Sequence, residues 1–179
     1  MNDFQHNPFW DYSLLLYGKP GVADACLYLQ DRYGLDVNLL LFCVWIGASG
    51  RGLLDAGDID TCIQRTGDWR ARVVEPLRAI RQACREEPLG VPEFLLQVFR
   101  PRMREIELDA EHVEQLVLAE AVRTRPAEPV ADDVRANDAR LNLAAYLSAS
   151  GMQRDERADD CLRALLSAAF PGSEFGELD

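Results

Sequence analysis

The chain has 179 residues, 48% hydrophobic and 27% charged, a composition that fits one compact domain and excludes disordered, collagenous and disulfide-scaffold proteins. Thirty acidic and nineteen basic residues give a formal net charge of -11, which repels nucleic acid and anionic membranes. We therefore expect neither as a partner. The charge is uneven, because residues 65–104 carry nine arginines and only five acidic residues.

Helical signals begin near the N-terminus. Asn7 and Pro8 predict a helix start, with a side-chain cap followed by proline at the first helical position, and Gly18 predicts the end of that helix. Apolar residues then recur at helical spacing over residues 22–33, directly before Gly34. Two consecutive helices are therefore predicted.

The next segment is the most apolar of the chain. Asp36 is predicted to cap it, and residues 39–46 are apolar on every side, as is typical of a helix enclosed by others. We predict a central helix at about 37–48 and expect it to be the most buried part of the fold. A glycine-rich loop is predicted at about 47–57.

The rest of the chain also shows helical periodicity, and no segment alternates like a strand. Residues 124–136 are predicted to be a mobile loop, and residues 171–179 a frayed tail. The predicted fold class is all-α, with residues 1–179 forming a single domain of about seven or eight helices around the central one. The later helices are predicted at about 58–66, 69–85 with a kink at Pro76, 92–106 with a kink at Pro101, 109–123, 137–149 and 155–170.

Several short motifs lie close together in residues 9–47. They are Trp10-Asp11, Tyr17, Pro20-Gly21-Val22, Cys26, Leu29-Gln30, Gly34, Asp36-Val37-Asn38 and Trp45. Together these motifs resemble the opening of a family of short, mostly proteobacterial proteins known only as a domain of unknown function. A weaker similarity reaches residue 78. The resemblance implies a bacterial soluble protein and implies no activity, cofactor or catalytic residue.

Four arginines share one side of the predicted helix at 69–85. On a helical wheel with about 100° per residue, Arg70, Arg78, Arg81 and Arg85 lie within about 80° of one another. The planar guanidinium groups of such an arginine row can donate paired hydrogen bonds to phosphates or to the carboxylates of an acidic partner. We interpret the row as a partner-binding surface. The alternative is that the row is solvated or pairs with the acidic C-terminal half of this protein.

A second group of residues is predicted to form a ligand pocket near the start of the central helix. The alternative for most of them is helix capping and aromatic packing. Glu120 belongs to the group because it falls inside the apolar stripe of its predicted helix, where a carboxylate needs an arginine partner or a raised pKa. The group comprises Trp10, Tyr17, Gln30, Asp36, Asn38 and Glu120.

Signals for catalytic and metal chemistry are weak. The two histidines, His6 and His112, do not follow a glutamate by three residues, which excludes a di-iron bundle. The five cysteines form no C-x-x-C pair and are expected to be reduced core thiols, and no phosphate-binding loop occurs. Acidic residues at 155–160 have a spacing that holds magnesium in helical isoprenoid enzymes, although helix N-terminal acids explain them more simply. We expect no metal and no cofactor.

These observations favour a non-catalytic protein that binds a macromolecular partner, most simply another protein, as an adaptor or regulator. The alternative is a small-ligand-binding helical protein, or a magnesium-dependent enzyme, with an acidic helical pocket. The chain starts without a signal-peptide pattern, and its longest apolar run, 39–48, is about half a membrane span, so we expect a cytoplasmic location.

Overall fold

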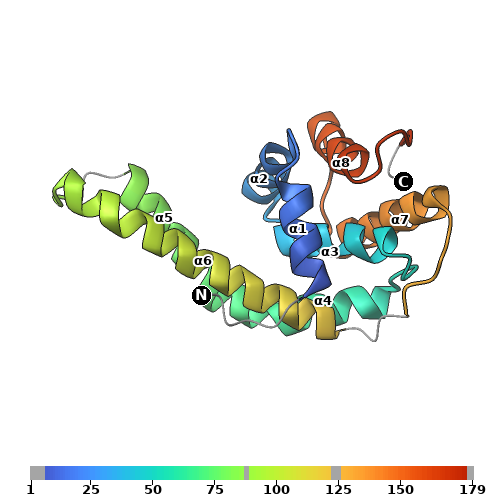
Figure 1. Cartoon of the computed structure of the whole chain (residues 1–179), viewed down its shortest axis with the longest axis horizontal. Helices are drawn as coiled ribbons and strands as arrows, with labels where there is room; N and C mark the ends of the chain where they lie inside the picture. The colour runs from blue at the N-terminus through green and yellow to red at the C-terminus, as the bar shows by residue number, and fades with distance from the viewer. Residues whose placement is uncertain (1–6, 87–88, 122–125, 177–179) are drawn as a thin grey trace.

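The structure is a computed structural model that describes residues 7–86, 89–121 and 126–176. All regular elements in these ranges are helical, so the predicted all-α class is confirmed. Figure 1 shows a body formed by α1–α3, α7 and α8, from which α5 and the first half of α6 project as a long arm. The elements are α1 (Pro8–Tyr17), α2 (Val22–Tyr33), α3 (Val37–Ala48), α4 (Ala56–Trp69), a π-helical segment η1 (Arg70–Val74), α5 (Glu75–Glu86), α6 (Glu93–Ala121), α7 (Asp132–Ser150) and α8 (Glu156–Ala169).

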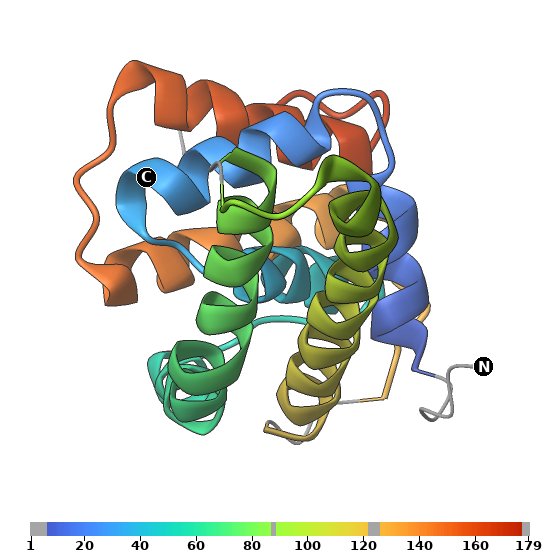
Figure 2. The ribbon, with the colours of Figure 1, turned by 90° about the vertical axis from the view of Figure 1, so that its left-hand side faces the viewer.

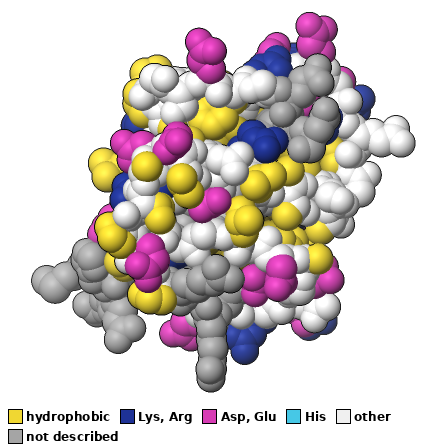
Figure 3. Space-filling view, turned by 90° about the vertical axis from the view of Figure 1, so that its right-hand side faces the viewer, with side chains coloured by type: hydrophobic (Ala, Val, Ile, Leu, Met, Phe, Trp, Pro, Cys, Tyr) yellow, Lys and Arg dark blue, Asp and Glu magenta, His cyan; other side chains and the backbone are white. Residues whose placement is uncertain are grey.

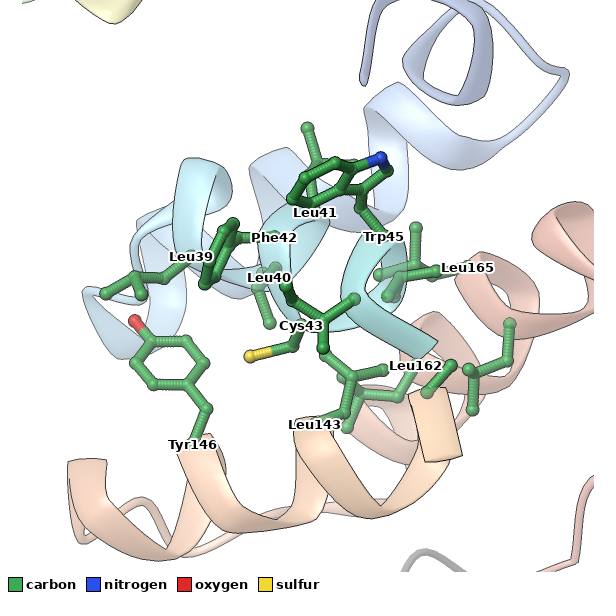
Figure 4. Close-up of a cluster of buried hydrophobic side chains, with 14 of the residues drawn as sticks. Leu39, Leu40, Leu41, Phe42, Cys43, Trp45, Leu143, Tyr146, Leu162 and Leu165 are labelled. Atoms are coloured by element: carbon green, nitrogen blue, oxygen red, sulfur yellow. The ribbon is translucent and has the colours of Figure 1, made fainter. Parts of the chain in front are cut away.

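Helix α3 is the central helix that the sequence predicts. Every residue from Asn38 to Gly47 is buried, and the helix packs against α7 most extensively, with α1, α2, α6 and α8 around it. Figure 4 shows Leu39 and Leu40 of α3 on the side of Tyr146 and Leu143 of α7, with Leu162 of α8 in the same cluster. A helix with no polar face can only be stable when enclosed in this way.

The chain from residue 56 to residue 86 forms one continuous helical rod, not the two helices predicted at 58–66 and 69–85. Asp55 caps its start and forms a reciprocal capping box with Asp58, which therefore lies inside the helix. The rod passes through the π-helical segment η1 immediately before Pro76. This wider turn accommodates the proline ring, which would clash with the preceding turn of a regular α-helix.

Helix α6 joins the two helices that were predicted at 92–106 and 109–123, so the predicted break before Asp109 is wrong. Pro101 lies within α6 and removes only one backbone hydrogen bond. Beside it, Arg100 donates from Nε to the carbonyl oxygen of Cys84 at 2.8 Å, which ties α6 to α5 across the arm.

The segment between α6 and α7 is shorter than predicted. Residues 132–136, predicted as part of a loop at 124–136, form the first turn of α7. The described part before them is fixed to another loop, because the Glu128 N–H donates to the Gly50 carbonyl oxygen at 3.0 Å. Three predicted segments extend outside the described residues: residues 122 and 123 end the helix predicted at 109–123, residues 124 and 125 begin the predicted loop, and residues 177–179 end the predicted tail. Among the described helices, none is both long and apolar enough to cross a membrane.

Candidate functional site

A cleft of about 380 Å³ lies between the body and the base of the arm. Figure 2 shows the arrangement from the arm side, with α5 and α6 side by side and α1 and α2 next to them. Five helices, α1, α2, α3, α5 and α6, supply the lining. The lining residues are Trp10, Ser13, Leu14, Tyr17, Leu27, Gln30, Val37, Asn38, Leu41, Arg78, Arg81, Arg85, Arg104, Glu107, Leu108, Glu111 and Gln115.

The cleft brings together most of the two residue groups predicted from the sequence. Four predicted pocket residues line it, namely Trp10, Tyr17, Gln30 and Asn38. So do three of the four arginines of the predicted row, Arg78, Arg81 and Arg85. The two groups therefore line the same cleft. Their binding roles stay predictions.

Three predicted residues are not in the lining. Asp36 is buried at the N-terminus of α3, and Arg70 lies next to it on η1. Glu120 is exposed on α6, so its predicted burial is wrong. The buried stripe of α6 runs instead through Met103, Glu107, Ala110, Glu114 and Leu118.

A chain of buried hydrogen bonds forms the polar floor of the cleft. Ser13 Oγ donates to Gln115 Oε1 at 3.0 Å, and Gln115 Nε2 donates to Asn38 Oδ1 at 2.8 Å. Asn38 Nδ2 donates to Glu114 Oε2 at 2.7 Å. This network joins α1, α6 and α3, and it orients the amide groups because each has a committed partner.

Asp36 and Glu114 form a buried acidic pair behind this floor. Asp36 caps α3 as predicted, since its Oδ1 accepts from the backbone N–H of Asn38 at 2.8 Å. Burial, the negative charge of Asp36 and a hydrogen bond to Asp36 together raise the pKa of Glu114 to about 9. Glu114 is therefore protonated at neutral pH and donates a hydrogen bond to the Asp36 carboxylate.

Arg70 supports this acidic pair from the π-helical segment. Its Nη2 donates to the Gly34 carbonyl oxygen at 2.8 Å, while its Nε lies 3.2 Å from Glu75 Oε1 and 4.0 Å from Asp36 Oδ2. The guanidinium thus partly compensates the buried charge of Asp36. Arg70 is therefore a half-buried residue that binds groups of this protein itself and does not line the cleft.

Arg78 and Arg81 form ion pairs with the acidic side chains of α6. Arg78 contacts Glu107 Oε1 at 3.3 Å and Glu111 Oε1 at 2.9 Å, and Arg81 forms a short hydrogen bond to Glu107 Oε2. Glu107 is buried, and burial raises the pKa of Glu111. Glu120 was expected to be buried, where it would need an arginine partner or a raised pKa. It is exposed, and the buried glutamate of α6 that pairs with arginines is Glu107.

Arg85 and Arg104 complete the charged wall of the cleft. Both are exposed, and neither has an ion-pair partner in the part of the chain that the structure describes. The lining therefore holds four arginines against two glutamates, although the whole chain carries a net charge of -11. At the end of the molecule opposite the arm, acidic side chains are scattered over the surface (Figure 3).

The other candidate centres have structural roles. Asp155 caps α8 by accepting from the Ala158 N–H at 2.8 Å, and Asp160 pairs with Arg163. Trp10 stacks on His112 with the ring centroids 4.1 Å apart. No group of three or more His, Cys, Asp or Glu side chains within the described residues is arranged to hold a metal ion. All five cysteines are free thiols, and four of them are buried.

An exposed apolar surface on α6 was not predicted from the sequence. Leu95, Val98, Phe99 and Ile106 share a helical phase with Met103, and this pattern by itself favours a single buried face. In the structure Met103 is buried, whereas the other four are exposed. The unusual apolar density of residues 94–99 is the signal that marks this surface.

Comparison with protein families gives one match, over residues 8–118, to a family described as a protein of unknown function, DUF2390. The chain belongs to this family. The DUF2390 match confirms the resemblance of residues 9–47 to a family of unknown function. It reaches residue 118 in the last turn of α6, so it contains the entire arm and every lining residue of the cleft. Helices α7 and α8 lie outside it. No curated protein and no solved structure matches the chain.

Proposed function

We propose that this protein is a non-catalytic cytoplasmic adaptor or regulator that binds a protein partner through the end of its arm. The observation that carries this proposal is a set of large apolar side chains exposed on the first two turns of α6. We call it the arm-end patch, and it consists of Phe94, Leu95, Val98 and Phe99. Phe94 is 67% exposed and Val98 59%.

The arm-end patch is contiguous because its members form i,i+4 pairs, Phe94 with Val98 and Leu95 with Phe99. Leu89 and Val91, which precede α6, are also more than one third exposed. The opposite side of α6 is already used, since Leu96 and Met103 are buried. Helix α6 therefore has a second apolar face that no described element of the chain covers, a feature that marks protein interaction sites.

The charges around the patch indicate the chemistry of the partner. Arg85, Arg102 and Arg104 on the arm are exposed and have no ion-pair partner among the described residues. We therefore expect the partner to offer an apolar surface bordered by acidic side chains. Aromatic anchors surrounded by charge are the usual composition of such interfaces.

Affinity capture from the native cell extract tests the proposal. Replacing Phe94 and Val98 together by serine is expected to reduce recovery of the bound protein more than tenfold, because both side chains would be buried against the partner in the complex and serine removes that contact. The melting temperature should be nearly unchanged, since both side chains are exposed in the free protein.

The control is the double variant L15S/V134S, which removes two exposed apolar side chains from the body instead of the arm. It should recover the partner like the wild type. Equal recovery by F94S/V98S and the wild type would refute the proposal. The proposal would also be refuted if the wild-type protein captured no protein from the extract and bound only to lipid vesicles, because the patch would then be a membrane-binding surface.

A further inference from the structure

The cleft at the base of the arm is a separate feature from the arm-end patch, and its volume of about 380 Å³ falls in the range of small-molecule sites. Its two walls differ in chemistry. Helices α1 and α2 contribute apolar and aromatic groups, including Leu14, Tyr17 and Leu27, whereas α5 and α6 contribute guanidinium groups. Leu14 and Leu27 are exposed.

The charged groups of the cleft all come from α5 and α6. Asn38 and Gln115 on the floor have committed their amide groups to the buried network. Arg78 and Arg81 are held in place by Glu107 and Glu111, whose negative charges balance theirs. Arg85 and Arg104 have no described ion-pair partner.

The surplus of positive charge in a concave site favours an anion. Field lines from the guanidinium groups concentrate in a cleft with apolar walls, which strengthens the attraction compared with the same charges on an open surface. Guanidinium groups also offer paired donors that match the oxygens of a carboxylate or a phosphate.

We propose that the cleft binds a small amphiphilic anion. Arg85 and Arg104 hold its carboxylate or phosphate head, and Leu14, Tyr17 and Leu27 contact its apolar body. This site uses none of the apolar residues of the arm-end patch, although Arg85 and Arg104 are also among the charged residues next to that patch. Acyl carboxylates and phosphate monoesters share the required chemistry, and the experiment below separates them.

The test uses the fluorescent anion 8-anilinonaphthalene-1-sulfonate as a probe, because it combines a charged head with an aromatic body. The dissociation constant is measured by titration of the purified full-length protein. The double variant R85S/R104S is expected to raise it at least tenfold. The control R72S/R102S removes the same charge from two exposed arginines outside the cleft and should change it less than twofold.

Competition defines the ligand class. Decanoate and decyl phosphate should both displace the probe, and their relative strength assigns the head group, whereas inorganic phosphate should displace it much more weakly. The variant F94S/V98S should retain displaceable binding, which separates the cleft from the arm-end patch. Circular dichroism melting verifies that each variant is folded.

Two results would overturn the proposal. The first is that R85S/R104S and R72S/R102S change the dissociation constant of the probe by the same factor. The charged group of the probe would then bind outside the cleft. The second is that inorganic phosphate displaces the probe as effectively as decanoate does. The apolar wall would then contribute nothing to the affinity for the ligand. Neither result bears on the arm-end patch, whose test uses different residues.

Discussion

Replacing Gly47 with alanine is expected to lower the free energy of unfolding by about 3 kcal/mol, because α3 and α7 approach each other too closely at this point for a side chain. A Cβ at residue 47 would lie 2.3 Å from the backbone nitrogen of Ala139 and 2.6 Å from its Cα. Backbone atoms cannot move away by changing a rotamer. The two helices would have to separate, which would loosen the contacts between α3 and α7. Urea denaturation of the variant measures the loss.

Gly67 provides the matched control. It also lies inside a helix, α4, but a Cβ built on it meets nothing within 4 Å. The variant Gly67→Ala should therefore gain about 0.5 to 1 kcal/mol, because alanine loses less conformational freedom than glycine in a helix. A Gly47→Ala protein as stable as the wild type would show that the contact between α3 and α7 is looser than the structure indicates.

The sequence was sufficient to predict the centre of the fold because α3 has no polar face. A helix of that composition has one stable environment, the interior, and its capping residue Asp36 marks where it starts. Helix boundaries elsewhere were harder to predict. Asp58 and Asp109 each have the residue type of a cap, yet both lie inside helices, because capping preferences are local and the neighbouring turns continue the helix.

The exposed surface of α6 could not be predicted from periodicity. A helical period shows which residues share a side, but it does not show which side is covered. Residues on two sides of the first half of α6 are apolar, and only one side packs on α5, because the arm projects from the body. The position of the arm depends on contacts between distant segments.

The cleft was predicted in parts but not as one site. Trp10 and Tyr17 were grouped with Asn38, and the arginine row was treated separately, because no local pattern relates α1 to α5. Treating α6 as two helices also moved the expected buried glutamate to Glu120. In one continuous helix, Glu107 and Glu114 follow Met103 on the buried stripe.

The acidic pair behind the cleft gives the fold a defined dependence on pH. Glu114 has a pKa of about 9 in the folded protein, compared with 4.5 for an unperturbed glutamate. Between these values the folded protein keeps a proton that the unfolded chain has released. Because the folded state binds more protons, Glu114 makes the protein less stable as the pH rises through this window.

The substitution Glu114→Gln is expected to stabilise the protein by about 2 kcal/mol at pH 8 and to flatten the dependence of stability on pH between about 5 and 9. A glutamine copies the protonated acid, because its oxygen can accept from Asn38 Nδ2 and its amide can donate to the Asp36 carboxylate. The unfolded chain then has no proton to release at this position. Urea denaturation at several pH values measures both effects.

The control Glu105→Gln makes the same substitution at an exposed position on α6. It should change the free energy of unfolding by less than about 0.5 kcal/mol throughout the range of about pH 5 to 9. If Glu114 is instead ionised in the folded protein, Glu114→Gln would leave the slope of stability against pH unchanged. The comparison therefore decides whether α3 and α6 are joined through a shared proton or through two repelling charges. Only the shared proton explains how two carboxylates remain buried side by side with Arg70 as their nearest cation.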